Sequence, residues 1–173
     1  AGGAGGDGRD TAGLASRNVD GEISDSYTND VRLTPGSPGT GGAGGSGDRD
    51  DNDGSSGDTG STGTTSGFAI RNDDTISSVY VTGLSSSVEA TGAILVENTG
   101  TITDAYWDTE TTGLDAAIGD DTGTQTRVTG LETREMRGVA ETTMSNFDFD
   151  ATWDVVFEAD DGRAVSYPFL RDN

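Results

Sequence analysis

Carboxylates are the side chains of this sequence that are best placed to do chemistry. Asp104, Asp108 and Glu110 lie close together along the chain, beside Tyr106 and Trp107. Paired carboxylates can cleave glycosidic bonds as acid and base, and an aromatic ring can stack on a sugar. With 31 Asp and Glu among 173 residues, such clusters also arise by chance. We therefore predict no catalytic residues and keep a polysaccharide-active enzyme only as a remote alternative.

A second acidic cluster, residues 48–54, resembles a calcium-binding loop. An EF-hand loop needs oxygen ligands at positions 1, 3 and 5, glycine at 6 and glutamate at 12. Aligning Gly54 with that glycine puts Arg49 at the first ligand position, so the match fails. A solvated linker is the favoured interpretation. No cofactor is predicted, and the candidates for a loosely bound cation at high salt are Asp50, Asp51 and Asp53.

The residues that are missing exclude several classes of function. The sequence has no His, Cys or Lys, which excludes thiol and imidazole nucleophiles, zinc fingers and haem ligation. A net charge of −21 argues against nucleic acid as a partner. No apolar run approaches the roughly 20 residues that cross a bilayer, so no membrane insertion is expected. The sequence also lacks a secretory signal and is expected to be a mature product or a fragment.

The charge composition has two interpretations. Low hydrophobicity combined with high net charge is typical of disordered chains. All ten basic residues are Arg, however, and an acidic surface without Lys is similar to that of halophilic archaeal proteins. At high salt the repulsion between carboxylates is screened. We favour the salt interpretation for most of the chain and disorder for one segment.

A repeat supports this division. Segments beginning at Gly13, Gly67 and Ala93 align, and the last two copies are 26 residues apart. Between the first two copies, Tyr27 and Tyr80 are 53 residues apart, one more than two such periods. This distance fits either a degenerate copy or an inserted segment between them, and the composition favours an insertion. The shared positions are Asn18, Asn72 and Asn98; Ile23, Ile76 and Ile102; and Tyr27, Tyr80 and Tyr106.

Each copy contains two short runs rich in Ser, Thr, Ile, Val and Tyr, which favour strands, joined at the Asn. Stacking the copies brings like residues into register. The sequence therefore predicts an all-β fold, a short parallel β-helix or β-solenoid. Strict alternation would bury Asp104 with its neighbours, so a corner is expected near Ser26, Val79 and Ala105, at a position that the sequence leaves open.

The expected organisation has five parts. Residues 1–12 are predicted to form a flexible Gly-rich tail, and residues 13–33 the first coil. Residues 34–66 form a long low-complexity acidic insertion, without an aliphatic residue larger than Ala43, that is expected to be a mobile loop of the disordered type. Residues 67–129 form the repeat coils. Residues 130–173 are expected to cap the last coil.

The cap is aromatic-rich. One short helix is expected at residues 132–137, followed by a concentration of aromatic residues. Trp107 is expected to join Trp153 in this cluster, while a second interpretation makes Trp107 the contact for a ligand. The predicted cap residues are Met136, Phe147, Phe149, Trp153, Tyr167 and Phe169.

The repeats followed by YWDTETTG, GLETREM, FDFDATW and YPFL resemble the GLUG-motif repeat region and C-terminal segment of adhesin-like surface proteins. The resemblance covers about residues 67–171 and, more loosely, 13–31. It implies an extracellular β-helical module and no particular reaction. We therefore predict a non-enzymatic extracellular structural protein of a halophile, displayed on the cell surface or assembled into a filament with itself or neighbouring surface proteins. An adhesin that binds glycans or other cells is the alternative.

Overall fold

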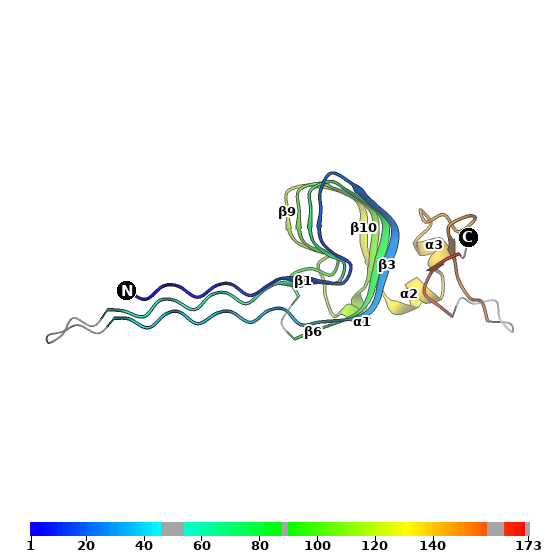
Figure 1. The fold of residues 1–173 in the computed structure, drawn as a ribbon. Helices are drawn as coiled ribbons and strands as arrows, with labels where there is room; N and C mark the ends of the chain where they lie inside the picture. The colour runs from blue at the N-terminus through cyan, green and yellow to red at the C-terminus, as the bar shows by residue number, and fades with distance from the viewer. Residues whose placement is uncertain (46–53, 88–89, 159–164, 172–173) are drawn as a thin grey trace.

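Two four-stranded parallel sheets form the centre of the molecule (Figure 1). The structure is a computed structural model that describes residues 1–45, 54–87, 90–158 and 165–171. One sheet has the order β10-β8-β6-β3 and the other the order β2-β5-β7-β9. The long-strand sheet contains β3 (Glu22–Leu33), β6 (Thr75–Ser86), β8 (Thr101–Asp108) and β10 (Thr124–Leu131). The short-strand sheet contains β2 (Ala15–Asn18), β5 (Ala69–Asn72), β7 (Leu95–Asn98) and β9 (Ile118–Asp121).

The chain alternates between the two sheets, so that each consecutive pair of strands forms one layer. Layer 1 contains β2 and β3, layer 2 β5 and β6, layer 3 β7 and β8, and layer 4 β9 and β10. The register is unbroken across layers: Ile23 pairs with Ile76, which pairs with Ile102. On a third side, β1 (Thr11–Ala12) pairs with β4 (Thr65–Ser66), and Ser66 bridges to Gly92. The prediction of a mainly β structure with parallel pairing is confirmed in this coarse form.

A left-handed residue bends each long strand. Asp25, Ser78, Asp104 and Arg127 have φ between 45° and 53° and occupy equivalent positions in the four layers. Such a residue inserts one extra position into the alternation of side chains. Ile102 therefore points into the space between the sheets, whereas Tyr106 packs against the C-terminal segment on the other side. The corner lies one residue before the expected positions.

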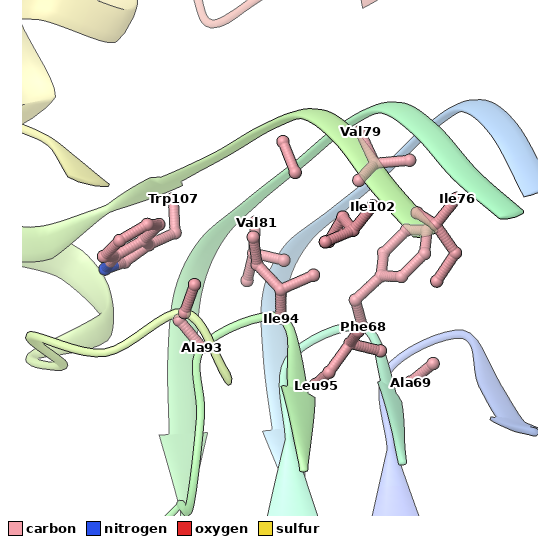
Figure 2. Close-up of a cluster of buried hydrophobic side chains, with 12 residues drawn as sticks. Phe68, Ala69, Ile76, Val79, Val81, Ala93, Ile94, Leu95, Ile102 and Trp107 are labelled. Carbon is pink, nitrogen blue, oxygen red and sulfur yellow. The ribbon is translucent and has the colours of Figure 1, made fainter. Parts of the chain in front are cut away.

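The space between the two sheets is filled by aliphatic and aromatic side chains (Figure 2). Phe68, Ile76, Ile94 and Ile102 are fully buried there. Ile76 and Ile102 come from the long strands, whereas Phe68 and Ile94 directly precede β5 and β7. Ile23 of layer 1 and Val128 of layer 4 pack against them, so each layer contributes to one continuous core. This core fixes the position of every strand that carries a candidate functional residue.

The C-terminal part packs beside the long-strand sheet. It contains α2 (Thr133–Arg137), α3 (Ala140–Thr143) and an antiparallel pair, β11 (Trp153–Asp154) with β12 (Phe169–Leu170). A further short helix, α1 (Thr109–Thr112), follows β8 directly. The predicted helix is confirmed as α2, which begins with a capping box between Glu132 and Glu135.

Three glycine-rich segments extend side by side away from the sheets (Figure 1). Residues 1–10, 34–45 and 54–64, here called the glycine bundle, form no helix or strand. Gly5 donates its backbone N–H to Asp58, Gly39 to Gly6, and Gly60 to Gly39, so the bonds pass around all three segments. The bonds recur at every third residue, as with the axial glycines of collagen. The first and third segments run parallel to each other, and the second runs antiparallel to both.

The sequence predicts a flexible tail and a loop for these segments, and this pairing was not anticipated. The recurring bonds of the bundle join backbone groups, so the lack of large aliphatic residues does not prevent them. The carboxylates of Asp7 and Asp10 add bonds from the backbone N–H groups of Ser61 and Thr64. Glycine is required where the segments approach each other, because a Cβ on Gly5 would lie 2.0 Å from the carbonyl oxygen of Gly39.

Candidate functional site

A ladder of side-chain hydrogen bonds runs through all four layers at the corner between the two sheets. Nδ2 of Asn18 donates to Oδ1 of Asn72 at 2.8 Å, and Nδ2 of Asn72 donates to Oδ1 of Asn98 at 2.8 Å. Nδ2 of Asn98 donates to Oδ1 of Asp121 at 2.7 Å. We call these four residues the Asn row. All the bonds point the same way along the stack, which gives the ladder a donor-to-acceptor direction.

Asp121 is the member of the Asn row that the sequence analysis missed. Its position is visible in the sequence, because Asp121-Thr-Gly-Thr124 repeats the pattern of Asn98-Thr-Gly-Thr101 at a distance of 23 residues. The Asp121 carboxylate also accepts a bond from Gln125, and this bond together with that from Asn98 lowers the pKa of Asp121. A carboxylate has no N–H, so the ladder ends there.

An ionic row lies on the outside of the short-strand sheet. Asp73 accepts bonds from both Arg17 and Arg71, at 2.7 Å and 2.6 Å. Arg71 also reaches Glu97 at 2.6 Å. A hydrogen bond from the hydroxyl of Thr99, together with the two guanidinium groups, lowers the pKa of Asp73 to about 2. These charges tie layers 1, 2 and 3 together.

The carboxylates suggested by the sequence for acid–base chemistry all have structural partners. Asp108 is fully buried and accepts bonds from the backbone N–H groups of Glu110 and Thr111 at the start of α1. Its other oxygen accepts bonds from the hydroxyls of Thr133 and Tyr167. Burial raises the pKa of Tyr167, and the bond to Asp108 adds to this effect. Four donors therefore hold Asp108 as the junction of α1, α2 and the C-terminal segment.

The other two carboxylates of that cluster are bonded in a similar way. Asp104 forms a two-point ion pair with Arg127 of the next layer. Glu110 accepts a bond from the backbone N–H of Thr133. The cation candidates Asp50, Asp51 and Asp53 lie outside the described residues. Among the residues that are described, no group of three or more acidic side chains is arranged to hold a metal ion.

Trp107 is not a surface residue, so the interpretation as a ligand contact is wrong. Its side chain lies in the core between the sheets with Val81 and Ala93 (Figure 2), and only 7% of it is exposed. Its indole N–H donates to the backbone oxygen of Leu114 at 2.8 Å. The left-handed Asp104 causes this orientation, because it places Ala105 and Trp107 inward and Tyr106 outward. Trp107 and Trp153 therefore belong to different clusters.

The predicted cap residues lie in a different place from the one expected. Tyr80 and Tyr106 form the floor of a cluster with Met136, Phe147 and Trp153, while Phe149 and Tyr167 pack at its margin. This cluster covers the outward side of the long-strand sheet and not the end of the last layer. The tyrosines Tyr27, Tyr80 and Tyr106, which are paired in register along the sheet, supply the aromatic surface for it. Phe169 is half-buried and pairs with Asp154 through its backbone.

A groove lies where this segment meets layers 1 and 2. Its volume is about 580 Å³, and its lining includes Tyr27, Asn29, Tyr80, Thr82 and Tyr167. The ring of Tyr27 stacks on that of Tyr80 with the centroids 5.0 Å apart, and 36% of Tyr27 is exposed. The groove thus combines aromatic faces with amide and hydroxyl groups.

No family model, curated protein sequence or solved structure matches this chain. None of the helices in the described ranges is long and apolar enough to span a membrane.

Proposed function

We propose that this chain is a non-enzymatic extracellular structural module, a short parallel β-solenoid displayed on the cell surface of a halophile. The likeness of its repeats to GLUG-motif surface proteins is part of the same proposal. Its role is to present a stiff, highly charged body outside the cell, with the glycine bundle as an extension.

The observation that carries the proposal is the Asn row. In-register stacking of identical side chains, with each amide bonded to the next, is the internal structure of a β-solenoid. The residues suited to chemistry are used for holding layers together: Asp104 and Asp108 are bonded within the fold, and so is Trp107. Such an arrangement supports a structural role better than a catalytic one.

The charge supports the location and the environment. With 31 acidic and 10 basic residues, the chain repels itself at low ionic strength. At about 1 M salt the screening length falls to about 3 Å, and this repulsion largely disappears. A structural protein of this composition therefore suits a surface that is bathed in concentrated salt.

The proposal is tested by labelling cells that produce the protein with an antibody against the folded chain. Labelling of intact cells equal to that of permeabilised cells is expected, and labelling only after permeabilisation would contradict display. Electron microscopy of the purified chain in about 3 M salt accompanies this test, because screening is then nearly complete. Isolated particles support display, whereas filaments with an axial repeat would replace display by self-assembly.

The groove beside Tyr27 favours a second candidate function, an adhesin that binds glycans. Exposed aromatic faces beside amide and hydroxyl groups are the surroundings that sugars favour. Binding to a glycan array in about 3 M salt, lost in Tyr27→Ala and kept in Val156→Ala, which changes an exposed residue outside the lining of the groove, would support it. The Tyr27→Ala variant must retain its melting temperature within a few degrees, and no binding by the unaltered chain would remove this candidate.

A further inference from the structure

The two ends of the stack are built differently. In layer 4, the Asn row ends in Asp121, the position of Ile102 is taken by Gln125, and the position of Tyr106 is taken by Thr129. Polar substitutions of this kind are what terminal repeats need for solubility. Layer 1 keeps Asn18, Ile23 and Tyr27, the residue types found inside the stack. The residue types of layer 4 are therefore those of a terminal layer, whereas the residue types of layer 1 are those of an interior layer.

The exposure of layer 1 follows the same pattern. Leu14 is 50% exposed, although Phe68 and Ile94, at the same place in layers 2 and 3, are fully buried. Val19 and Tyr27 are also large apolar residues with substantial exposure in this layer. Strand β3 is twelve residues long and, within the described parts of the chain, has a neighbour on one side only. Long unprotected edge strands of this kind readily pair with another chain.

The Asn row specifies what such a neighbour must carry. Nδ2 of Asn18 donates hydrogen bonds to Oδ1 of Asn72 and to the backbone oxygen of Thr75. Oδ1 of Asn18 accepts no hydrogen bond from any described residue, although the corresponding atoms of Asn72 and Asn98 each accept an amide N–H. The ladder is therefore open at its acceptor end, and a side-chain amide in the next layer would continue it.

We propose that the exposed edge of layer 1 binds a parallel β-layer of a second protein, one that carries an Asn in the Asn row and an aromatic residue eight or nine positions later. This spacing is the one between Asn and Tyr in layers 1 to 3 of this chain. The partner would add a strand to each sheet by β-augmentation, cover Leu14 and stack a ring on Tyr27. This inference rests on the proposed solenoid and names the partner of its open end.

A second copy of this chain fits the edge poorly. Stacked head to tail, it would bring the carboxylate of Asp121 against Oδ1 of Asn18. Stacked head to head, it would bring two Oδ1 atoms of Asn18 together. Neither arrangement supplies a donor, and both bring together chains with a charge of −21. Residues 1–10 do not cover the edge either, because they run outward in the glycine bundle (Figure 1).

The test uses a labelled peptide with the sequence of residues 67–86, which carries Asn72, Ile76 and Tyr80 in the required order. Its binding to the intact chain is measured by fluorescence anisotropy in about 3 M salt, where charge repulsion is screened. Saturable binding is expected. The same peptide with Asn72→Asp has no amide donor, so its affinity is expected to fall at least about tenfold.

Two protein variants with matched exposure locate the binding. Leu14→Asp places a charge on the edge and should weaken peptide binding at least about tenfold. Val139→Asp changes a residue that is 51% exposed at the start of α3 and should leave binding unchanged. Hydrogen exchange of β6 and β8 in each variant verifies that the inner layers remain paired.

Three results would overturn the inference. The first is that the unaltered peptide does not bind at concentrations up to its solubility limit. The second is that the unaltered peptide and the Asn72→Asp peptide bind with equal affinity. The third is that the intact chain self-associates and that Leu14→Asp abolishes this self-association. The last result would make a second copy the occupant. Cell-surface labelling is independent of all three, so failure of the docking edge and failure of the proposed display are distinguishable.

Discussion

The hydroxyl of Tyr167 donates a hydrogen bond across 2.5 Å to Oδ2 of Asp108, a residue 59 positions earlier in the chain. Asp108 ends strand β8 and is fully buried. Through this bond and the one from Thr133, the C-terminal segment is attached to layer 3 at a polar point, beside the apolar cluster around Trp153.

Replacing Tyr167 by Phe should destabilise the chain by about 1–3 kcal/mol, because one donor to a buried carboxylate is lost. Urea unfolding at a fixed high salt concentration measures the change. Tyr27→Phe is the matched control, since its hydroxyl makes no hydrogen bond within the described residues. That variant should lie within about 0.5 kcal/mol of the unaltered chain. Equal losses for both variants would show that the bond to Asp108 contributes little.

The Asn row predicts a strong asymmetry between its middle and its end. Asn72→Asp removes a donor and places a charge at a fully buried position, with an expected loss of about 3–5 kcal/mol. Asp121→Asn leaves the bond from Asn98 in place and should change stability by less than about 1 kcal/mol. Unfolding curves of both variants in the same salt check this, and similar losses would contradict the direction of the ladder.

Acid should weaken the ionic row in a defined range. The folded-state pKa of Asp73 is about 2, below the value of about 3.9 for an unfolded aspartate. Its contribution to stability is therefore complete above about pH 4 and is lost as the pH falls toward about 2. The difference in unfolding free energy between the unaltered chain and Asp73→Asn should shrink over this range. A difference that stays constant from about pH 5 to about pH 2 would show that Asp73 is not held ionised.

Much of this architecture could be predicted from the sequence because the repeat records it directly. The spacing of Asn72 and Asn98 predicts that they stack, and the structure joins them by a hydrogen bond. The side of the sheet on which Trp107 lies could not be predicted, because it depends on the left-handed conformation of one residue, Asp104. Aspartate adopts this conformation in some positions and not in others, so its presence in the sequence does not reveal it. Asp121 was not recognised from the sequence as a member of the Asn row, because a carboxylate replaces the amide in the last layer.

The position of the C-terminal segment also could not be predicted from the sequence. Aromatic residues predict burial but not the surface against which they are buried. The tyrosines that receive them are recognisable as a repeat, yet strict alternation gave no reason to place Tyr80 and Tyr106 on the outward side.

Substitutions at two neighbouring glycines test whether the three segments of the glycine bundle are paired in solution. Gly5→Ala places a methyl group 2.0 Å from the oxygen of Gly39, whereas a methyl group on Gly6 has no atom within 4 Å. Faster amide exchange at Gly39 and Gly60 is expected for Gly5→Ala and no change for Gly6→Ala. If both variants exchange alike, the three segments are not joined in solution.

Trp107→Ala should cost about 3–5 kcal/mol of stability, the usual loss for a large aromatic residue in a core. Val156→Ala, at a half-exposed position, should cost less than about 0.5 kcal/mol. Thermal or urea unfolding distinguishes them. A Trp107→Ala chain of unchanged stability would mean that the core of Figure 2 is not closely packed around this ring.

The parallel pairing of residues 1–10 with residues 54–64 also sets a time order for folding during synthesis. Gly8 cannot obtain its bond until Ser61 has left the ribosome, and β3 has to wait longer still for β6. At roughly 5–20 residues per second, the 53 positions from Gly8 to Ser61 take about 3–11 s to synthesise. Residues 1–10 therefore stay unpaired for this interval after their own synthesis, and their lack of large apolar side chains keeps them soluble until residues 54–64 arrive.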